Sequence, residues 1–259
     1  MTCDDEQAKE EKGRSPDECT GEQIRKCHGE VQHPCTTSYK DKGLKPGRES
    51  CVEAEGTPER ATHLPEWFVP VAEDVFNYCR PDQGLWVDLG SGSGGLGLAL
   101  ARGSCSTVVF VDSSAKALSD ALENAKQSGL AGRARAVAGR AESLPLASGS
   151  VNLVTSRGSI FFWNDPPRGL REVYRILRPG ARALVGGGFG SSYPEWALEE
   201  FRRRRDKHIR AQGRKALHDW YEVRRPEWLA AQAQAAGLGE FLVKPVPPGF
   251  WLLVEKGTG

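Results

Sequence analysis

Short apolar runs alternate with amphipathic stretches from about residue 63 to the C-terminus. Each run is short enough to be a strand, and an uninterrupted apolar run such as residues 107–111 is typical of a strand covered on both faces. Five such runs are followed by two more near the C-terminus, where they surround a Pro-Pro-Gly turn and predict an antiparallel hairpin. The seven predicted strands lie at residues 85–88, 107–111, 135–138, 151–154, 183–185, 241–243 and 251–254.

The stretches between these runs predict helices. In residues 115–128, apolar side chains recur at helical spacing, with Ser113 or Ser114 as the N-cap and Gly129 as the stop. Asp165 precedes Pro-Pro at the start of another helix. Regular alternation of strands and helices predicts an α/β fold with a doubly wound, mostly parallel sheet. The side chains predicted to face inward from residues 115–128 are Leu118, Ala121, Leu122 and Ala125.

Residues 1–62 have a different character. They are polar, their few apolar residues form no stripe, and they therefore predict a disordered extension ahead of a folded domain at residues 63–259. The extension holds Cys27, His28, His33 and Cys35, four potential metal ligands within nine residues. Structural zinc sites use cysteine pairs with two to four residues between them, and this spacing is lacking. We therefore predict no metal site and keep these four residues as the weaker alternative.

Composition excludes several function classes. The 259 residues are 39% hydrophobic and 27% charged, with a net charge of +1, so nothing in the overall charge favours nucleic acid or an anionic membrane as a partner. The charged first residues resemble no secretion signal, and no run reaches the roughly 20 apolar residues of a membrane span. These features predict a cytoplasmic protein.

The segment between the first two predicted strands is rich in glycine. Residues 90, 92 and 94 are glycines at alternate positions, which allow close approach of a ligand, and the helix that follows presents free N–H groups. Asp112 follows the next strand, 22 residues after Gly90, where a carboxylate can bind ribose hydroxyls. The sequence predicts a nucleoside site here.

Two ligands fit this turn. Residues 92–97 match the G-x-G-x-x-G pattern of dinucleotide-binding folds, which would make the chain a nicotinamide-dependent oxidoreductase. Asp88 favours another ligand, because a carboxylate beside the turn would repel a pyrophosphate and attract the ammonium of a methionyl group. The alternative for Asp88 is a buried side chain that only hydrogen-bonds the turn.

Five segments in this order resemble the successive motifs of class I S-adenosyl-L-methionine (SAM)-dependent methyltransferases. The resemblance covers residues 63–259 and is greatest for the broad subgroup that acts on small molecules. It implies a Rossmann-like methyltransferase fold, SAM as cofactor and a small-molecule acceptor. The segments are VDLGSGSG (87–94), FVDSS (110–114), GRAESLPL (139–146), VNLVTSRGSIFFW (151–163) and EVYRILRPGARALVGG (172–187).

The resemblance also implies roles for individual residues. The methionine part of SAM would meet Asp88 and Gly90, the ribose would meet Asp112, and the adenine would lie beside Ala141 and Glu142. Where the family often has an aspartate for the adenine amino group, this chain has Arg140, so Glu142 or a backbone group would take that contact. The remaining cofactor contacts implied are Ser91, Gly92 and Gly94 in the turn, Ser113 at the adenosine edge and Ser156 near the methyl group.

No residue stands out as a catalytic base. Methyl transfer needs the acceptor about 3–3.5 Å from the methyl group, in line with the sulfur, and only a weak nucleophile also needs a base. The pocket candidates are Arg157, Trp163 and His208. No Asn/Asp-Pro-Pro-aromatic motif follows residues 151–154, which argues against DNA base methylation. A metal- or metalloid-handling protein that uses the N-terminal extension is a third interpretation. Neither the acceptor nor the oligomeric state follows from the sequence.

Overall fold

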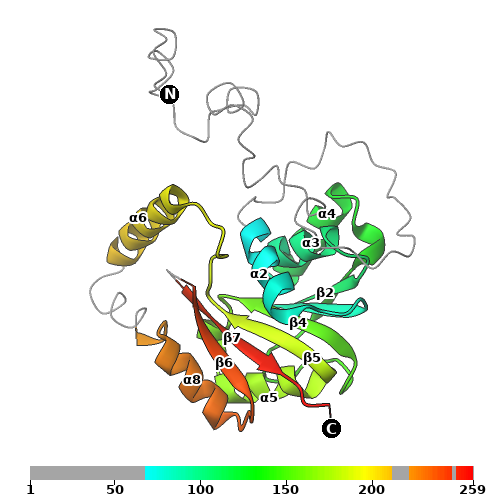
Figure 1. Cartoon of the computed structure of the whole chain (residues 1–259). Coiled ribbons are helices and arrows are strands. Elements are labelled where there is room, and N and C mark those ends of the chain that lie inside the picture. Colours follow the sequence, from blue (N-terminus) through cyan, green and yellow to red (C-terminus); the bar gives the residue numbers. More distant parts are fainter. Residues whose placement is uncertain (1–67, 212–221, 247–248, 259) are drawn as a thin grey trace, which may run out of the picture. The chain divides into compact units, whose positions relative to one another are not determined.

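A computed structural model describes residues 68–211, 222–246 and 249–258, which form an α/β fold around a seven-stranded sheet (Figure 1). The strand order is β3-β2-β1-β4-β5-β7-β6. The first five strands are parallel, whereas β7 runs antiparallel to both β5 and β6. The predicted mostly parallel sheet with a C-terminal hairpin is confirmed. The strands are β1 (Leu85–Leu89), β2 (Thr107–Asp112), β3 (Ala134–Ala138), β4 (Val151–Arg157), β5 (Leu177–Gly186), β6 (Phe241–Val246) and β7 (Gly249–Glu255).

Helices cover both faces of the sheet (Figure 1). One face carries α2 (Val69–Cys79), α3 (Gly95–Arg102) and α4 (Ala115–Gln127), whose buried side chains share one apolar cluster. The other face carries α5 (Pro166–Ile176) and α8 (Pro226–Ala235), which contact each other and belong to a second cluster. A further helix, α6 (Glu195–Ala211), follows β5. This doubly wound arrangement leaves the carboxyl ends of the parallel strands for a ligand.

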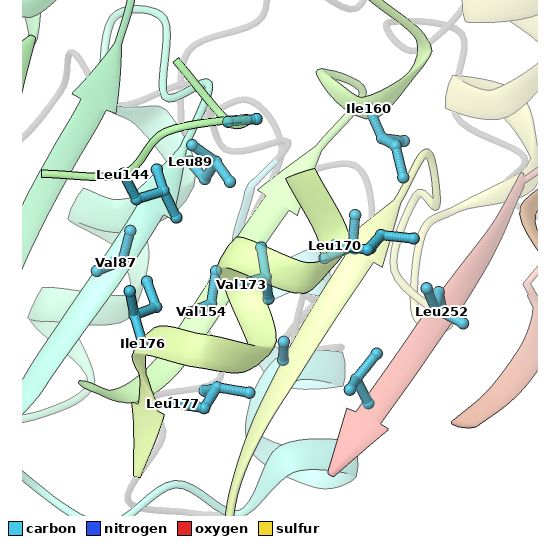
Figure 2. Close-up of a cluster of buried hydrophobic side chains, with 14 of the residues drawn as sticks. Val87, Leu89, Leu144, Val154, Ile160, Leu170, Val173, Ile176, Leu177 and Leu252 are labelled. Carbon is cyan, nitrogen blue, oxygen red and sulfur yellow. The ribbon is translucent and has the colours of Figure 1, made fainter. Parts of the chain in front are cut away.

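The side chains of β1 alternate between the two clusters. Val87 and Leu89 join the cluster beneath α5, which Figure 2 shows, while Trp86 joins the cluster beneath α2 and α3. Successive strand residues point to opposite faces, so Asp88 lies on the same face as Trp86. This parity places the Asp88 carboxyl group beneath α3.

Two predicted helix caps are present. The Ser114 hydroxyl accepts a hydrogen bond from the Ala117 N–H at 3.2 Å, and the Asp165 carboxylate accepts one from the Arg168 N–H at 2.9 Å. The prediction for Leu122 was wrong, because this side chain is 41% exposed whereas Leu118, Ala121 and Ala125 are buried. Leu122 lies next to Ala121, about 100° further around the helix, beyond the stripe that meets the sheet.

Some predictions fall outside the described residues. Cys27, His28, His33, Cys35 and the boundary at residue 63 belong to this group. Within the described ranges, no group of three or more His, Cys, Asp and Glu side chains is placed to hold a metal ion. No helix in that part of the chain has the length and apolar character required to cross a membrane.

Candidate active site

A cleft of about 620 Å³ lies at the carboxyl ends of the parallel strands. Open α/β sheets bind their ligands at this edge, where the strand order reverses between β1 and β4. The cleft is lined from the ends of β1, β2 and β3 on one side, and from the ends of β4 and β5 and the start of β7 on the other. The elements that the sequence singled out therefore meet in one place.

The glycine turn after β1 forms part of the cleft wall. Gly90 donates its N–H to the Val111 carbonyl at 2.7 Å, which ties the turn to the end of β2. Its φ of +66° suits glycine, and a Cβ at this position would clash with the Ser159 side chain. Gly92 also has positive φ and lines the cleft, with open space where a Cβ would lie. Ser91 and Gly94 belong to the same turn but do not line the cleft.

Asp112 stands at the end of β2 and lines the cleft. Its Oδ2 accepts the Gly92 N–H at 3.0 Å, and its Oδ1 accepts the Ser114 N–H at 2.9 Å. Each carboxylate oxygen has a second lone pair, so two further hydrogen bonds remain available to a ligand. Asp112 thus fixes the glycine turn and presents an acceptor to the cleft. Ser113, the next residue, also lines it.

Asp88 lies behind the cleft wall, whereas direct contact with a methionyl group would require a position in the cleft. It is 3% exposed, does not line the cleft, and accepts the Gly97 N–H at 2.8 Å through Oδ2. Burial raises its pKa to about 7, partly offset by the hydrogen bond from Gly97. The geometry is that of the alternative considered for Asp88, a buried acid that braces the turn and the first turn of α3.

The loop after β3 forms the adjoining wall through Gly139, Arg140, Ala141 and Glu142. Glu142 Oε1 accepts the N–H groups of Asn164 and Asp165 at 2.7 and 3.2 Å, and Oε2 lies 3.8 Å from Arg140 Nε. Burial opposes ionisation of Glu142, but these N–H donors and the arginine lower its pKa overall. One carboxylate oxygen of Glu142 is therefore held by the chain, and the other faces Arg140.

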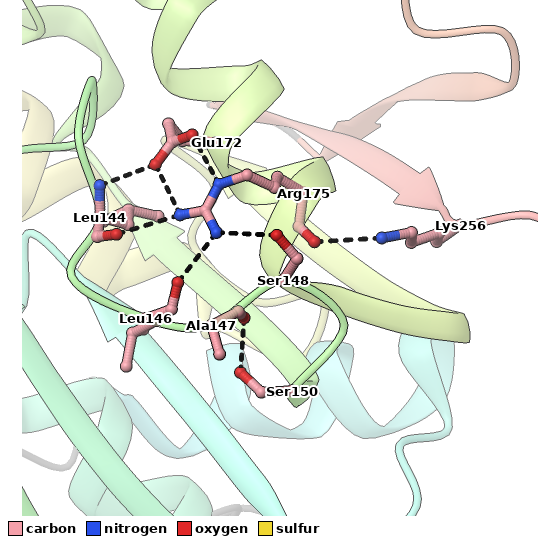
Figure 3. Close-up of polar contacts among 8 residues, drawn as sticks. All are labelled: Leu144, Leu146, Ala147, Ser148, Ser150, Glu172, Arg175 and Lys256. Carbon is pink, nitrogen blue, oxygen red and sulfur yellow. Dashed lines mark hydrogen bonds and ion pairs between the residues drawn. The ribbon is translucent and has the colours of Figure 1, made fainter.

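A cluster of hydrogen bonds holds the rest of this loop on α5 (Figure 3). The Arg175 guanidinium donates to both carboxylate oxygens of Glu172 at 2.7 and 2.8 Å, and to the carbonyls of Leu144 and Leu146 at 3.0 and 2.9 Å. Glu172 also accepts the Leu144 N–H at 2.9 Å. The loop that carries Ala141 is thus anchored to α5 at Leu144, three residues after Ala141.

At the end of β4, Ser159 lines the cleft instead of Ser156, the serine that was expected there. Ser156 is fully buried and hydrogen-bonded to Ser159, so it does not reach the cleft, whereas Ser159 lines it. Ser159 Oγ donates to the Leu89 carbonyl and accepts the Trp163 Nε1–H, both at 3.1 Å. Trp163 lines the cleft, as do Phe161 and Phe162, the latter 72% exposed.

Arg157 is the last residue of β4 and lines the cleft, as expected. Its Nε donates to the Gly188 carbonyl at 3.0 Å, and its guanidinium carbon lies 4.8 Å from the Phe189 ring centre and 5.4 Å from that of Phe68. Burial lowers its pKa. His208 belongs to α6, and its side chain lies outside the described part of the structure.

Several lining residues were not predicted. Phe189 follows the glycine run 186–188, and the structure explains that run by close packing, because a Cβ on Gly188 would clash with the Trp251 indole. Ser159 follows Gly158 just after β4, and this glycine is the only local feature of the sequence that points to Ser159 as a lining residue. Arg224 and Phe250 come from later segments, which the fold alone brings to the cleft.

The strand order of the sheet distinguishes the fold of this chain from the dinucleotide-binding fold, which has a similar glycine turn. The dinucleotide-binding fold has six parallel strands in the order 3-2-1-4-5-6. Here the strand beside β5 is the antiparallel β7, which lies between β5 and β6. The sheet therefore departs from the dinucleotide-binding pattern at this edge.

Comparisons with known proteins agree with this fold. Residues 87–185 match the family described as "Methyltransferase domain". A solved structure of a proposed S-adenosyl-L-methionine-dependent methyltransferase from Methanococcus maripaludis superposes with a TM-score of 0.62. It is 28% identical in sequence, and the match covers 76% of this chain and 88% of that one.

Two curated relatives are similar over shorter segments. The 2-methyl-6-phytyl-1,4-hydroquinone methyltransferase of Arabidopsis thaliana is 34% identical over 47% of this chain and 34% of its own length. The ubiquinone/menaquinone biosynthesis C-methyltransferase of Vibrio vulnificus is 31% identical over 41% of each chain. The match thus spans about a third to two fifths of these relatives. Residues 87–185 therefore match a methyltransferase domain, and the chain shares the fold of a proposed SAM-dependent methyltransferase.

Proposed function

We propose that this chain is a SAM-dependent methyltransferase acting on a small molecule, with residues 63–259 as the catalytic domain. The observation that carries the proposal is the pairing of Asp112 with the glycine turn. A carboxylate with free lone pairs stands at the end of β2, and its hydrogen bond to the Gly92 N–H fixes the turn that an adenosine would approach. The family match over the same residues supports SAM as the nucleoside.

The cofactor would extend along the β1 to β3 side of the cleft. Asp112 would accept the ribose hydroxyls, Ser113 would lie at the adenosine edge, and the adenine would lie against Ala141 and Glu142. Gly92, which has open space where a Cβ would lie, leaves room for the chain that joins ribose and sulfur, and Gly90 would line the same path. The other predicted residues would act from behind the cleft wall. Asp88 would hold the start of α3, Ser91 and Gly94 the turn, and Ser156 the end of β4.

The other side of the cleft would receive the acceptor. Its lining is mostly aromatic, from Phe161, Phe189 and Phe250, which suits a planar ring. The relatives named above are methyltransferases of a hydroquinone and of ubiquinone/menaquinone biosynthesis. We therefore extend the proposal to an acceptor with a hydroxylated aromatic ring.

The residues of the cleft would contribute position rather than acid–base catalysis. An acceptor ring with an ionised hydroxyl is electron-rich and would attack a methyl group without a general base, and SAM would supply that methyl group and a neutral sulfide as leaving group. If the attacking atom were a ring carbon, its proton would pass to solvent water as the product leaves the cleft, which would restore aromaticity. The role of the chain is to align acceptor and sulfonium and to exclude water.

A labelled-methyl assay tests this proposal. The full-length chain is incubated with methyl-labelled SAM and three separate acceptor pools: short-chain hydroquinones, bulk RNA and denatured protein. The proposal predicts label in a hydroquinone product and none in RNA or protein. Label confined to a macromolecule would contradict the small-molecule assignment, and NADH oxidation without any methylation would favour the oxidoreductase alternative.

A further inference from the structure

The cleft has two chemically different halves. Its acidic side chains are Asp112 at the end of β2 and Glu142 after β3, where the lining residue Arg140 lies 3.8 Å from the Glu142 carboxylate. On the other side, Arg157 ends β4, Arg224 precedes α8, and the described lining there holds no acidic side chain. The half left to the acceptor is therefore cationic and aromatic.

Both arginines lie on aromatic rings. Arg157 is placed between Phe68 and Phe189 with its Nε bonded to the Gly188 carbonyl, and it has no ion pair with any residue that the structure describes. The Arg224 guanidinium carbon lies 4.5 Å from the Phe161 ring centre and 5.4 Å from that of Phe162. For Arg157, stacking on Phe68 and Phe189 holds the plane of the guanidinium and leaves its remaining N–H groups for a ligand.

Burial makes an unpaired cation costly, and it lowers the pKa of Arg157, which forms no ion pair with a residue that the structure describes. An arginine nevertheless keeps its charge in proteins. The sulfonium of SAM would add a further positive charge to the same cleft. An acceptor that carries a negative charge would relieve this repulsion, whereas a cationic one would increase it.

We propose that the methyl acceptor is an aromatic oxyanion, a carboxylate or a phenolate, which the Arg157 guanidinium binds while its ring lies among Phe161, Phe189 and Phe250. This inference rests on the proposed function. The orientation of the Arg157 side chain supports this inference. Its Nε–H donates to the Gly188 carbonyl just beyond β5, on the side of the cleft away from Asp112. A fork of N–H donors also suits a carboxylate geometrically.

Matched pairs of anionic and neutral aromatic probes test the inference. Binding to the full-length chain, saturated with S-adenosylhomocysteine (SAH), is measured by calorimetry. One pair is 4-hydroxybenzoate and 4-hydroxybenzamide, and the other is 4-nitrophenolate and its neutral methyl ether. We expect the anion of at least one pair to bind about tenfold more tightly than its neutral partner, since a charge-assisted hydrogen bond has that magnitude. The better pair identifies the oxyanion as carboxylate or phenolate.

Substitutions connect this preference to Arg157. Arg157→Gln should abolish the preference for the anion, and Arg157→Lys, which keeps the charge but loses the fork, should retain part of it. Arg178→Gln is the control, because it removes the same charge from an exposed position near the start of β5, whereas Arg157 on β4 pairs with Gly186 at the other end of β5. Thermal unfolding verifies that each variant is folded.

Three results would overturn the inference. These are equal binding of both probes in both pairs, an anion preference that survives Arg157→Gln, and a loss of SAH affinity in Arg157→Gln with unchanged affinity for 5′-methylthioadenosine. The last would assign Arg157 to the carboxylate of the cofactor, because 5′-methylthioadenosine lacks it. Failure of the wild-type chain to bind SAH would contradict the proposed function itself, so the two failures are distinguishable.

Discussion

Asp88 and Asp112 lie at the ends of neighbouring strands, and the structure gives their carboxyl groups opposite environments. Asp112 reaches the cleft and holds the glycine turn through the Gly92 N–H, whereas Asp88 is buried beneath α3 and bonded to the Gly97 N–H. Asp112 therefore holds the glycine turn, and Asp88 holds the first turn of the helix that follows it. Only Asp112 remains available to a ligand.

Replacement of Asp112 tests its assignment to the ribose. Asp112→Ala removes the acceptor of the ribose hydroxyls and the bond that fixes the turn, so SAH affinity should fall about tenfold to hundredfold in calorimetry. Asp120→Ala is the matched control, since that carboxylate pairs only with Lys116 on the surface of α4. If Asp112→Ala binds SAH as tightly as the wild type, the placement of the ribose is wrong.

The raised pKa of Asp88 predicts a pH-dependent stability. Between the ordinary pKa near 3.8 and about 7, the folded chain binds a proton at Asp88 that the unfolded chain has released. Stability should therefore fall as pH rises through this window, by up to about 4 kcal/mol, and level off above it. Denaturant unfolding of wild type and Asp88→Asn from pH 4 to 8 measures the difference. Parallel pH profiles for the two proteins would show that Asp88 ionises normally.

At the scale of elements, α5 positions the loop that forms the adenine wall. Arg175 and Glu172 on α5 bind the backbone of residues 144–146, and Glu142 accepts N–H groups at the start of the same helix (Figure 3). The helix is in turn fixed by Leu170, Val173 and Ile176 in the core (Figure 2). The cleft wall thus depends on a packed helix and not on the loop alone.

Removal of the Arg175 guanidinium should loosen this wall. Arg175→Met removes the guanidinium that donates to Glu172 and to two loop carbonyls. This loss should lower the free energy of unfolding by about 1–3 kcal/mol and weaken SAH binding severalfold. Arg178→Met, an exposed change just beyond α5, is the control. Denaturant unfolding and SAH calorimetry on both variants check this. Normal SAH affinity despite the lost stability would show that the loop keeps its shape unaided.

The sequence predicted elements better than side-chain positions. Apolar runs and caps such as Ser114 located the strands and helices, because burial and capping are local in sequence. Asp88 and Ser156 were expected at the ligand, but strand parity and the Ser156–Ser159 hydrogen bond turn them away. Arg224 lines the cleft from just before α8, far along the chain from the strand ends that it meets, and no local pattern in the sequence encodes this contact.

For the molecule as a whole, strand order and charge divide the cleft into two parts. Asp112 and Glu142 line the cleft at the ends of β2 and β3, whereas arginine and aromatic side chains line it at the ends of β4 and β5 and the start of β7. We propose that SAM binds between these two parts, with its methyl group toward the aromatic half. The antiparallel β7 separates this architecture from that of the nicotinamide-dependent oxidoreductases, which share the glycine turn.

The most direct test of this account is the relative affinity of the unmodified full-length chain for SAH and NADH, measured by titration calorimetry under the same conditions. The account predicts one SAH per chain, bound at least about a hundredfold more tightly than NADH. Tight NADH binding with no measurable SAH binding would contradict it.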